Sequence, residues 1–169
     1  MIVDCFLDTN ILIYAALGKA TEEAKRKAAS ELIASTQFGL SAQVLQEFYT
    51  VVTRKSARPL PPVQALEWIE LLEVFPCVPI DASLVKRGAE NAVRYRISYW
   101  DGAILAAAEA LGAATLYSED LNDGQNYGGV RVCNPFKHLP KSGFHEGAAD
   151  ARGGPASGTG QIRSPQHKF

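Results

Sequence analysis

The first fourteen residues of the chain, MIVDCFLDTNILIY (residues 1–14), decide how the rest of the sequence is interpreted. Apolar runs on either side of positions 8–10 predict a buried strand followed by a buried helix. Between the runs lie Asp8, Thr9 and Asn10, three polar side chains that a plain core strand does not need. A buried carboxylate costs several kcal/mol unless something pairs with it. Asp8 therefore requires a partner that this stretch does not supply.

Beyond this stretch, short apolar segments alternate with segments of helical period. Strands are expected at residues 2–7, 38–42, 77–80, 113–118 and 130–136, and helices at residues 10–17, 24–35, 42–55, 63–75, 82–96 and 99–112. This alternation is typical of α/β proteins. We predict a three-layer α/β/α sandwich with a mostly parallel central sheet.

Bulk composition is that of a soluble globular domain. The chain has 169 residues, of which 47% are hydrophobic and 21% charged. No apolar stretch approaches the roughly 20 residues that span a bilayer, and the N-terminus lacks the basic region of a signal peptide. Cys5, Cys77 and Cys133 are odd in number and far apart, which predicts free thiols in a reducing cytoplasm. The net charge of −1 means that nucleic-acid binding would need a local basic patch.

The composition changes near the C-terminus, where Gly, Ala, Ser and Pro dominate, as in GGPASGTGQIRSPQ (residues 153–166). Such a segment has too few apolar side chains to offset the entropy of ordering. We therefore predict a folded domain over residues 1–139 and a flexible tail over residues 140–169. The sequence leaves the origin and role of this tail open.

Four acidic residues occupy positions where the local pattern would favour other side chains: Asp8, Glu47, Asp101 and Asp120. Asp8 and Asp120 each follow a predicted strand, and ligands of open parallel sheets bind at the carboxyl ends of strands. Glu47 falls beside the apolar face of its helix, without Lys or Arg three or four residues away, so it is expected near the core margin. Asp101 lies in the first turn of the last helix.

Each of these acids also has a structural explanation. Asp101 suits helix capping, Glu47 suits a solvated helix edge, and Asp120 suits a turn. Taken together, four converging carboxylates would repel one another unless a cation lay among them. Hard oxygen ligands without His or Cys indicate Mg²⁺ or Mn²⁺, an ion that suits phosphodiester hydrolysis. Thr9 and Ser118 would place hydroxyl groups beside the acids.

Four segments carry a resemblance to a known family: FLDTNILIY (6–14), SAQVLQEFYTVV (41–52), WDGAILAAAEALG (100–112) and LYSEDLNDGQNYGGVRVCNPF (116–136). In this order and spacing they resemble the PIN-domain nucleases and, more narrowly, the VapC-type toxins of bacterial toxin–antitoxin pairs. The resemblance covers roughly residues 1–139. It implies a metal-dependent endoribonuclease with a three-layer α/β/α fold. Such toxins are usually homodimers silenced by an antitoxin, which would be a separate chain.

The resemblance also implies roles for individual residues. Carried over by position, the catalytic and metal-binding acids are Asp8, Glu47, Asp101 and Asp120, and the supporting hydroxyl and amide groups belong to Thr9, Asn10 and Ser118. The stretch SEDLND also offers Glu119 and Asp123. The S-x-D spacing favours Asp120 as the fourth acid, and Asp123 stays in reserve.

An RNA substrate would need contacts outside the acidic cluster. Candidates are Arg54, Lys55, Arg94, Arg96 and Tyr99, because phosphate contacts supply most of the affinity for nucleic acids and aromatic rings stack on unpaired bases. Each basic candidate also suits an ordinary solvated helix surface. For Trp100, which precedes Asp101, packing in the core is the favoured expectation.

Two other functions compete with a toxin nuclease. The first is a housekeeping PIN nuclease in RNA processing, which the small size and the lack of added nucleic-acid-binding domains disfavour. The second is a non-catalytic partner-binding domain, which would have no reason to keep four mutually repelling acids. The sequence leaves open the RNA target, the identity of the antitoxin, the choice between Mg²⁺ and Mn²⁺, and the number of ions.

Overall fold

The computed structural model describes residues 3–17 and 22–139. Its elements in chain order are β1 (Cys5–Leu7), α1 (Thr9–Leu17), α2 (Glu23–Ser35), β2 (Phe38–Ser41), α3 (Ala42–Thr50), η2 (Val51–Lys55), α4 (Pro62–Leu72), β3 (Cys77–Val78), α5 (Ala82–Tyr95), α6 (Tyr99–Ala110), β4 (Thr115–Tyr117), β5 (Asn126–Tyr127) and β6 (Val130–Cys133). The predicted tail, residues 140–169, lies outside the described residues, so the division of the chain at residue 139 stays a prediction.

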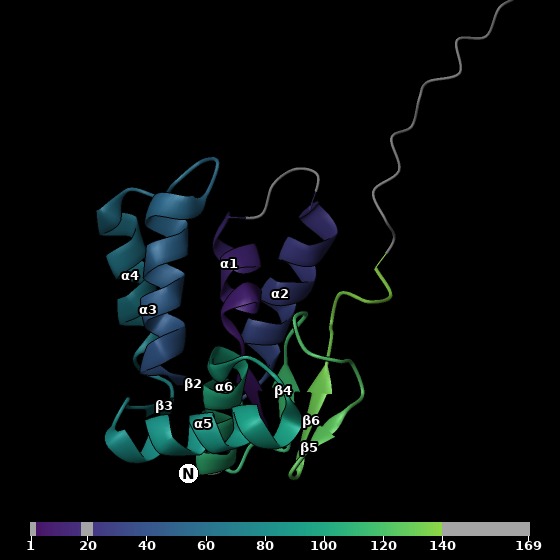
Figure 1. Cartoon of the computed structure of the whole chain (residues 1–169). Coiled ribbons are helices and arrows are strands. Elements are labelled where there is room, and N and C mark those ends of the chain that lie inside the picture. Colours follow the sequence, from purple (N-terminus) through teal and green to yellow (C-terminus); the bar gives the residue numbers. More distant parts are fainter. Residues whose placement is uncertain (1–2, 18–21, 140–169) are drawn as a thin grey trace, which may run out of the picture.

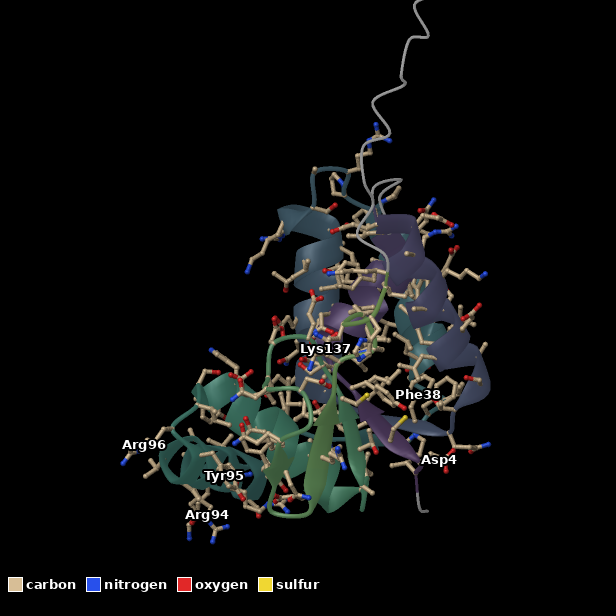
Figure 2. All side chains as sticks on the ribbon, turned by 90° about the vertical axis from the view of Figure 1, so that its right-hand side faces the viewer. Asp4, Phe38, Arg94, Tyr95, Arg96 and Lys137 are labelled. Carbon is tan, nitrogen blue, oxygen red and sulfur yellow. The ribbon has the colours of Figure 1, made fainter. Side chains whose placement is uncertain are left out.

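Six strands form one sheet in the order β3-β2-β1-β4-β6-β5 (Figure 1). Neighbouring strands run parallel except β5 and β6. Figure 2 shows the sheet between α5 and α6 on one side and α2 on the other. The predicted three-layer α/β/α sandwich with a mostly parallel sheet is confirmed. No helix among the described residues is long and apolar enough to cross a membrane.

The core is centred on β1 and α6. All three residues of β1 are buried, as expected for a central parallel strand covered on both faces. In α6 every residue from Gly102 to Ala108 is buried. A Cβ added at Gly102 would meet the backbone oxygen of Gly88, so glycine at this position allows α5 and α6 to pack closely. This packing fixes the first turn of α6, which carries Asp101.

Two elements differ from the sequence-based prediction. The helix expected over residues 42–55 ends its α-helical part at Thr50 and continues as a π-helical turn, η2. Strand β5 was not predicted, although it forms a hairpin with β6 through Gly128 and Gly129, whose φ angles are positive. A Gly-Gly pair is a recognised hairpin signal, but β5 has only two residues and shows no alternation of its own.

Candidate active site

The candidate site lies where the strand order reverses. β1 and β4 are neighbours in the sheet, with Leu7 opposite Tyr117, and their carboxyl ends lie at the same edge. In the sheet, β2 lies next to β1 on one side of this pair, and β6 lies next to β4 on the other side. Such a switch point leaves a crevice in which ligands of open α/β sheets bind. Asp8 follows β1 directly, and Ser118 follows β4.

Asp8 is buried, with 4% of its surface exposed. Its Oδ1 accepts a hydrogen bond from the backbone N–H of Thr9 at 2.7 Å. Its Oδ2 accepts from the hydroxyl of Ser118 at 2.6 Å and from the amide Nδ2 of Asn10 at 3.1 Å. All three donors are uncharged. The carboxylate is therefore fixed in position, and in the part of the chain that the structure describes no positively charged side chain pairs with it to offset its burial.

The electrostatics follow from this arrangement. The pKa of Asp8 is raised from 3.8 to about 7, mainly by burial. The negative charges of Asp120 and Glu47 contribute to this rise, and the hydrogen bonds from Ser118 and Thr9 act against it. A nearby cation would act in the opposite direction and favour the charged carboxylate. Asp8 is thus placed where a positive ion would be strongly stabilising.

Two more of the predicted acids belong to the same hydrogen-bond network. The Nδ2 of Asn10 also donates to Oδ2 of Asp120, at 3.1 Å, so one amide group joins the carboxylates of Asp8 and Asp120. The hydroxyl of Thr9 donates to Oε2 of Glu47 at 3.0 Å. The structure therefore brings Asp8, Asp120 and Glu47 together through the amide of Asn10 and through Thr9, whose backbone N–H binds Asp8 and whose hydroxyl binds Glu47.

Glu47 is more exposed than predicted. It was expected near the core margin, but it is an exposed residue of α3. The buried side of this helix includes Val44 and Phe48, and Gln43 rather than Glu47 fills the adjoining buried position, with 7% of its surface exposed. The prediction erred because helical period does not tell how far a neighbouring element covers the edge of an apolar face.

Asp101 is held differently from the other three acids. Its Oδ2 accepts from the hydroxyl of Ser98 at 2.6 Å, and its N–H donates to the same hydroxyl at 3.1 Å, an N-terminal capping arrangement. Its hydrogen bonds thus connect it to the start of α6. The Nε2 of Gln43 donates to the backbone oxygen of Trp100 at 3.3 Å, which attaches this first turn to α3, the helix of Glu47.

The donor set fits a hard divalent cation held by few protein ligands. Within residues 3–17 and 22–139, no three acidic, His or Cys side chains form a ready metal cluster. The Oδ1 of Asn10 is buried and has no hydrogen-bond donor among the same residues. A half-turn of this side-chain amide would place an oxygen between the carboxylates of Asp8 and Asp120, an arrangement that only a cation would favour.

The other two acids of the SEDLND segment, Glu119 and Asp123, form hydrogen bonds outside the network of Asp8. Glu119 accepts from the hydroxyl of Tyr14 at 2.6 Å and from Nζ of Lys25 at 2.7 Å. Asp123 accepts from the backbone N–H of Asn134 and from Nζ of Lys137, and these two hydrogen bonds lower its pKa. Of the three acids in SEDLND, the one hydrogen-bonded to Asn10 is Asp120. The geometry thus favours Asp120 over Asp123 as a partner of Asp8.

Tyr14 and Lys25 were missed as residues that hold the loop after β4. Lys25 lies 94 residues before Glu119 in the chain, and its Nζ also lies 4.4 Å from the centre of the Tyr14 ring. No local sequence pattern could have revealed such a contact. Through Glu119, these two side chains fix the segment that carries Ser118 and Asp120.

The predicted RNA-binding residues are spread over the molecule. Arg54 and Lys55 are exposed at the end of η2. Arg94 and Arg96 are exposed at the end of α5, and Figure 2 shows them at the level of Asp4, where β1 begins, away from its carboxyl end. Within the described residues, neither Arg94 nor Arg96 forms an ion pair with any of the four acids.

Of the two aromatic residues before Asp101, Trp100 departs from expectation. Tyr99 is half-buried, and its ring makes an edge contact with Trp100 at 5.3 Å between ring centres. The expectation that Trp100 packs in the core is wrong, because 64% of it is exposed. The fully buried part of α6 starts at Gly102, so a side chain two residues earlier lies beyond the layer that covers the sheet.

The raised pKa of Asp8 predicts how the stability of the metal-free protein depends on pH. A folded-state pKa of about 7, against an ordinary value of 3.8, means that the folded state binds this proton more tightly than the unfolded state. The free energy of unfolding should therefore fall as the pH rises between these two values and level off above the higher one. The loss should amount to a few kcal/mol, at about 1.4 kcal/mol per pKa unit.

Urea unfolding in EDTA across this pH range measures the effect. The Asp8→Asn variant is the control, because it lacks the titrating group and keeps the side-chain shape. Its free energy of unfolding should not show the fall with rising pH that the wild-type protein shows. Identical pH profiles for the two proteins would show that Asp8 does not titrate in this range.

Comparisons with known proteins address the family. A PIN domain profile matches residues 5–122. A comparison with curated proteins found no match. Among solved structures, the toxin VapC20 of Mycobacterium tuberculosis, described as a sarcin–ricin loop cleaving toxin, is 25% identical with a TM-score of 0.56, over 69% of this chain and 89% of that chain.

Two further structures are similar in fold. A toxin–antitoxin complex from Klebsiella pneumoniae matches at 21% identity and a TM-score of 0.57, over 78% of this chain and 97% of that chain. FitAcB from Neisseria gonorrhoeae matches at 24% identity and a TM-score of 0.52, over 80% and 99%. The resemblance to PIN-domain nucleases and VapC-type toxins is confirmed. Since the profile match covers well over half of the chain, this protein belongs to the PIN domain family of nucleases.

Proposed function

We propose that this protein is a metal-dependent endoribonuclease that hydrolyses RNA phosphodiester bonds and acts as the toxin of a toxin–antitoxin pair. One observation carries the proposal most directly. At the switch point of the sheet, the buried Asp8 shares the amide of Asn10 with Asp120, and no positively charged side chain within residues 3–17 and 22–139 pairs with it. A cation bound at this position would offset the cost of burying the Asp8 carboxylate.

Asp8 and Asp120 would hold the ion, with Asn10 supplying a further oxygen. Magnesium is usually bound by one or two carboxylates, with waters and substrate phosphates completing its shell. This requirement agrees with the observed site, in which the two carboxylates of Asp8 and Asp120 accept hydrogen bonds from the amide of Asn10. When bound, Mg²⁺ or Mn²⁺ would acidify a water molecule and neutralise charge on the phosphoryl oxygens.

The other residues would position the reacting groups. The hydroxyl of Ser118 accepts from the backbone N–H of Asp120 and donates to Asp8, so it links the carboxylate of Asp8 to the backbone that carries Asp120. Glu47 is exposed to solvent and fixed through Oε2 by Thr9, so it can orient a water molecule and accept its proton. Asp101, at the start of α6, would complete the acidic rim.

The biological role rests on the relatives. VapC20 of Mycobacterium tuberculosis is a sarcin–ricin loop cleaving toxin, and a similar structure from Klebsiella pneumoniae is a toxin–antitoxin complex. By analogy, this chain would bind a separate antitoxin and form a homodimer. Its cysteines Cys5, Cys77 and Cys133 are free, which supports action in the reducing cytoplasm.

Metal removal tests the enzymatic proposal. The purified protein is incubated with labelled total RNA in Mg²⁺, in Mn²⁺ and in EDTA, and metal binding is measured separately by calorimetry. We expect discrete products with either metal and none in EDTA, because the acidic site depends on the ion. Cleavage that persists in EDTA would contradict metal dependence. Absence of both cleavage and metal binding would favour a non-catalytic partner-binding domain.

A further inference from the structure

A pocket of about 390 Å³ opens beside the acidic network, between α3, η2 and the first turn of α6. Its lining includes Gln46 and Glu47 from α3, Lys55 from η2 and Trp100 from α6. Glu47 belongs both to this pocket and to the network of Asp8, through the hydroxyl of Thr9. A ligand in the pocket would thus lie next to the candidate reaction site.

The indole of Trp100 is exposed but held in place. Its exposed fraction is 64%, unusual for so large an apolar side chain. The edge contact with the ring of Tyr99 restrains it from one side, at an interplanar angle of 72°. The backbone oxygen of Trp100 accepts a hydrogen bond from the buried Gln43. A fixed aromatic ring at the wall of an open pocket provides a stacking surface at low entropic cost.

The remaining groups suit the other parts of a nucleotide. Lys55 is the last residue of the π-helical turn η2 and lines the pocket. It forms no ion pair within the described part of the chain. It is available for a phosphate. Gln46 is exposed, and its side-chain amide can donate to and accept from the edge of a base. Proteins that bind single-stranded RNA combine these three kinds of contact.

We propose that this pocket is a nucleobase subsite, in which an unpaired base next to the cleaved phosphodiester stacks on Trp100. Lys55 contacts the neighbouring phosphate, and Gln46 contacts the base edge. The substrate class is therefore single-stranded RNA, or a loop whose bases are splayed out, because a base stacked within a duplex cannot reach the ring. This inference rests on the proposed ribonuclease function and adds its mode of substrate selection.

Tryptophan fluorescence tests the subsite without any cleavage. The chain contains two tryptophans, and the other one, Trp68, is half-buried and packs against Phe48. The full chain is titrated in EDTA with a short single-stranded RNA of mixed sequence and with the same RNA as a duplex. We expect the single strand to quench the wild-type fluorescence and the duplex to do so much less. The Trp100→Phe variant, which keeps only Trp68, should show almost no quenching.

Kinetics with metal supply a second readout. Trp100→Ala should raise KM about tenfold with kcat little changed, since it removes a stacking contact and no reacting group. Trp100→Phe keeps an aromatic face and should stay within about threefold of the wild-type KM. Val93→Ala is the matched control, because Val93 is 82% exposed on α5 and outside the pocket lining.

The outcomes separate the subsite from the ribonuclease activity. Quenching by single-stranded RNA without cleavage in any metal would support the subsite and contradict the proposed enzyme. Cleavage by the wild-type protein, with no quenching and an unchanged KM in Trp100→Ala, would overturn the subsite and leave the enzyme standing. Equal quenching by single strand and duplex would also overturn the subsite.

Discussion

Replacing Asp8 with asparagine is expected to reduce kcat/KM for RNA cleavage by about 10³-fold or more, since a bound metal contributes several kcal/mol to the transition state. Asparagine has nearly the same shape, but its single side-chain oxygen can accept only one of the two hydrogen bonds that the N–H of Thr9 and the hydroxyl of Ser118 donate to the two oxygens of Asp8. The change therefore removes charge and leaves packing almost intact. Cleavage assays with Mg²⁺, together with calorimetric titration of the metal, measure the two consequences.

Stability distinguishes a catalytic loss from misfolding. In EDTA above pH 7, Asp8→Asn should be more stable than the wild-type protein, because it replaces a buried charge by a neutral group. Asp4→Asn is the matched control, since Asp4 is an exposed aspartate in the same N-terminal segment, hydrogen-bonded to the backbone of Gln37. It should retain full activity. An Asp8→Asn variant that cleaves RNA normally would show that Asp8 is structural.

The second large effect concerns the fourth acid. Asp120→Asn is expected to lower kcat/KM by about 100-fold or more, because it removes the second carboxylate from the site formed around Asn10. Asp123→Asn should cleave RNA at nearly the wild-type rate. Its carboxylate binds Lys137 and the N–H of Asn134, so its loss should affect the local loop. Parallel assays of both variants at saturating Mg²⁺ make the comparison.

Metal titration of the same two variants completes the test. Asp120→Asn should bind Mn²⁺ more weakly than wild type, and Asp123→Asn should bind it equally well. The reverse pattern would assign the fourth acid to Asp123 and would make the bridge from Asn10 to Asp120 a structural contact. Similar losses in both variants would indicate that the whole loop, not one carboxylate, supports the site.

The sequence determined the layers of this fold and the side chains available at the edge of its sheet. Periodicity is a local property, so each main strand and helix was found within a few residues of its observed bounds. The position of Asp8 directly after a buried strand was equally local. The short strand β5 was not predicted, because two residues are too few to show an alternating pattern.

Only the tertiary structure decided which groups meet. Asp8 and Ser118 lie 110 residues apart, and the contact between them depends on β1 and β4 being neighbours in the sheet. The pairing of Lys25 with Glu119 depends on the same long-range packing. Trp100 shows the limit most clearly, because its exposure is set by where the covering layer ends. Side-chain period fixes the direction in which a residue points, but only the packed neighbours decide whether anything lies there.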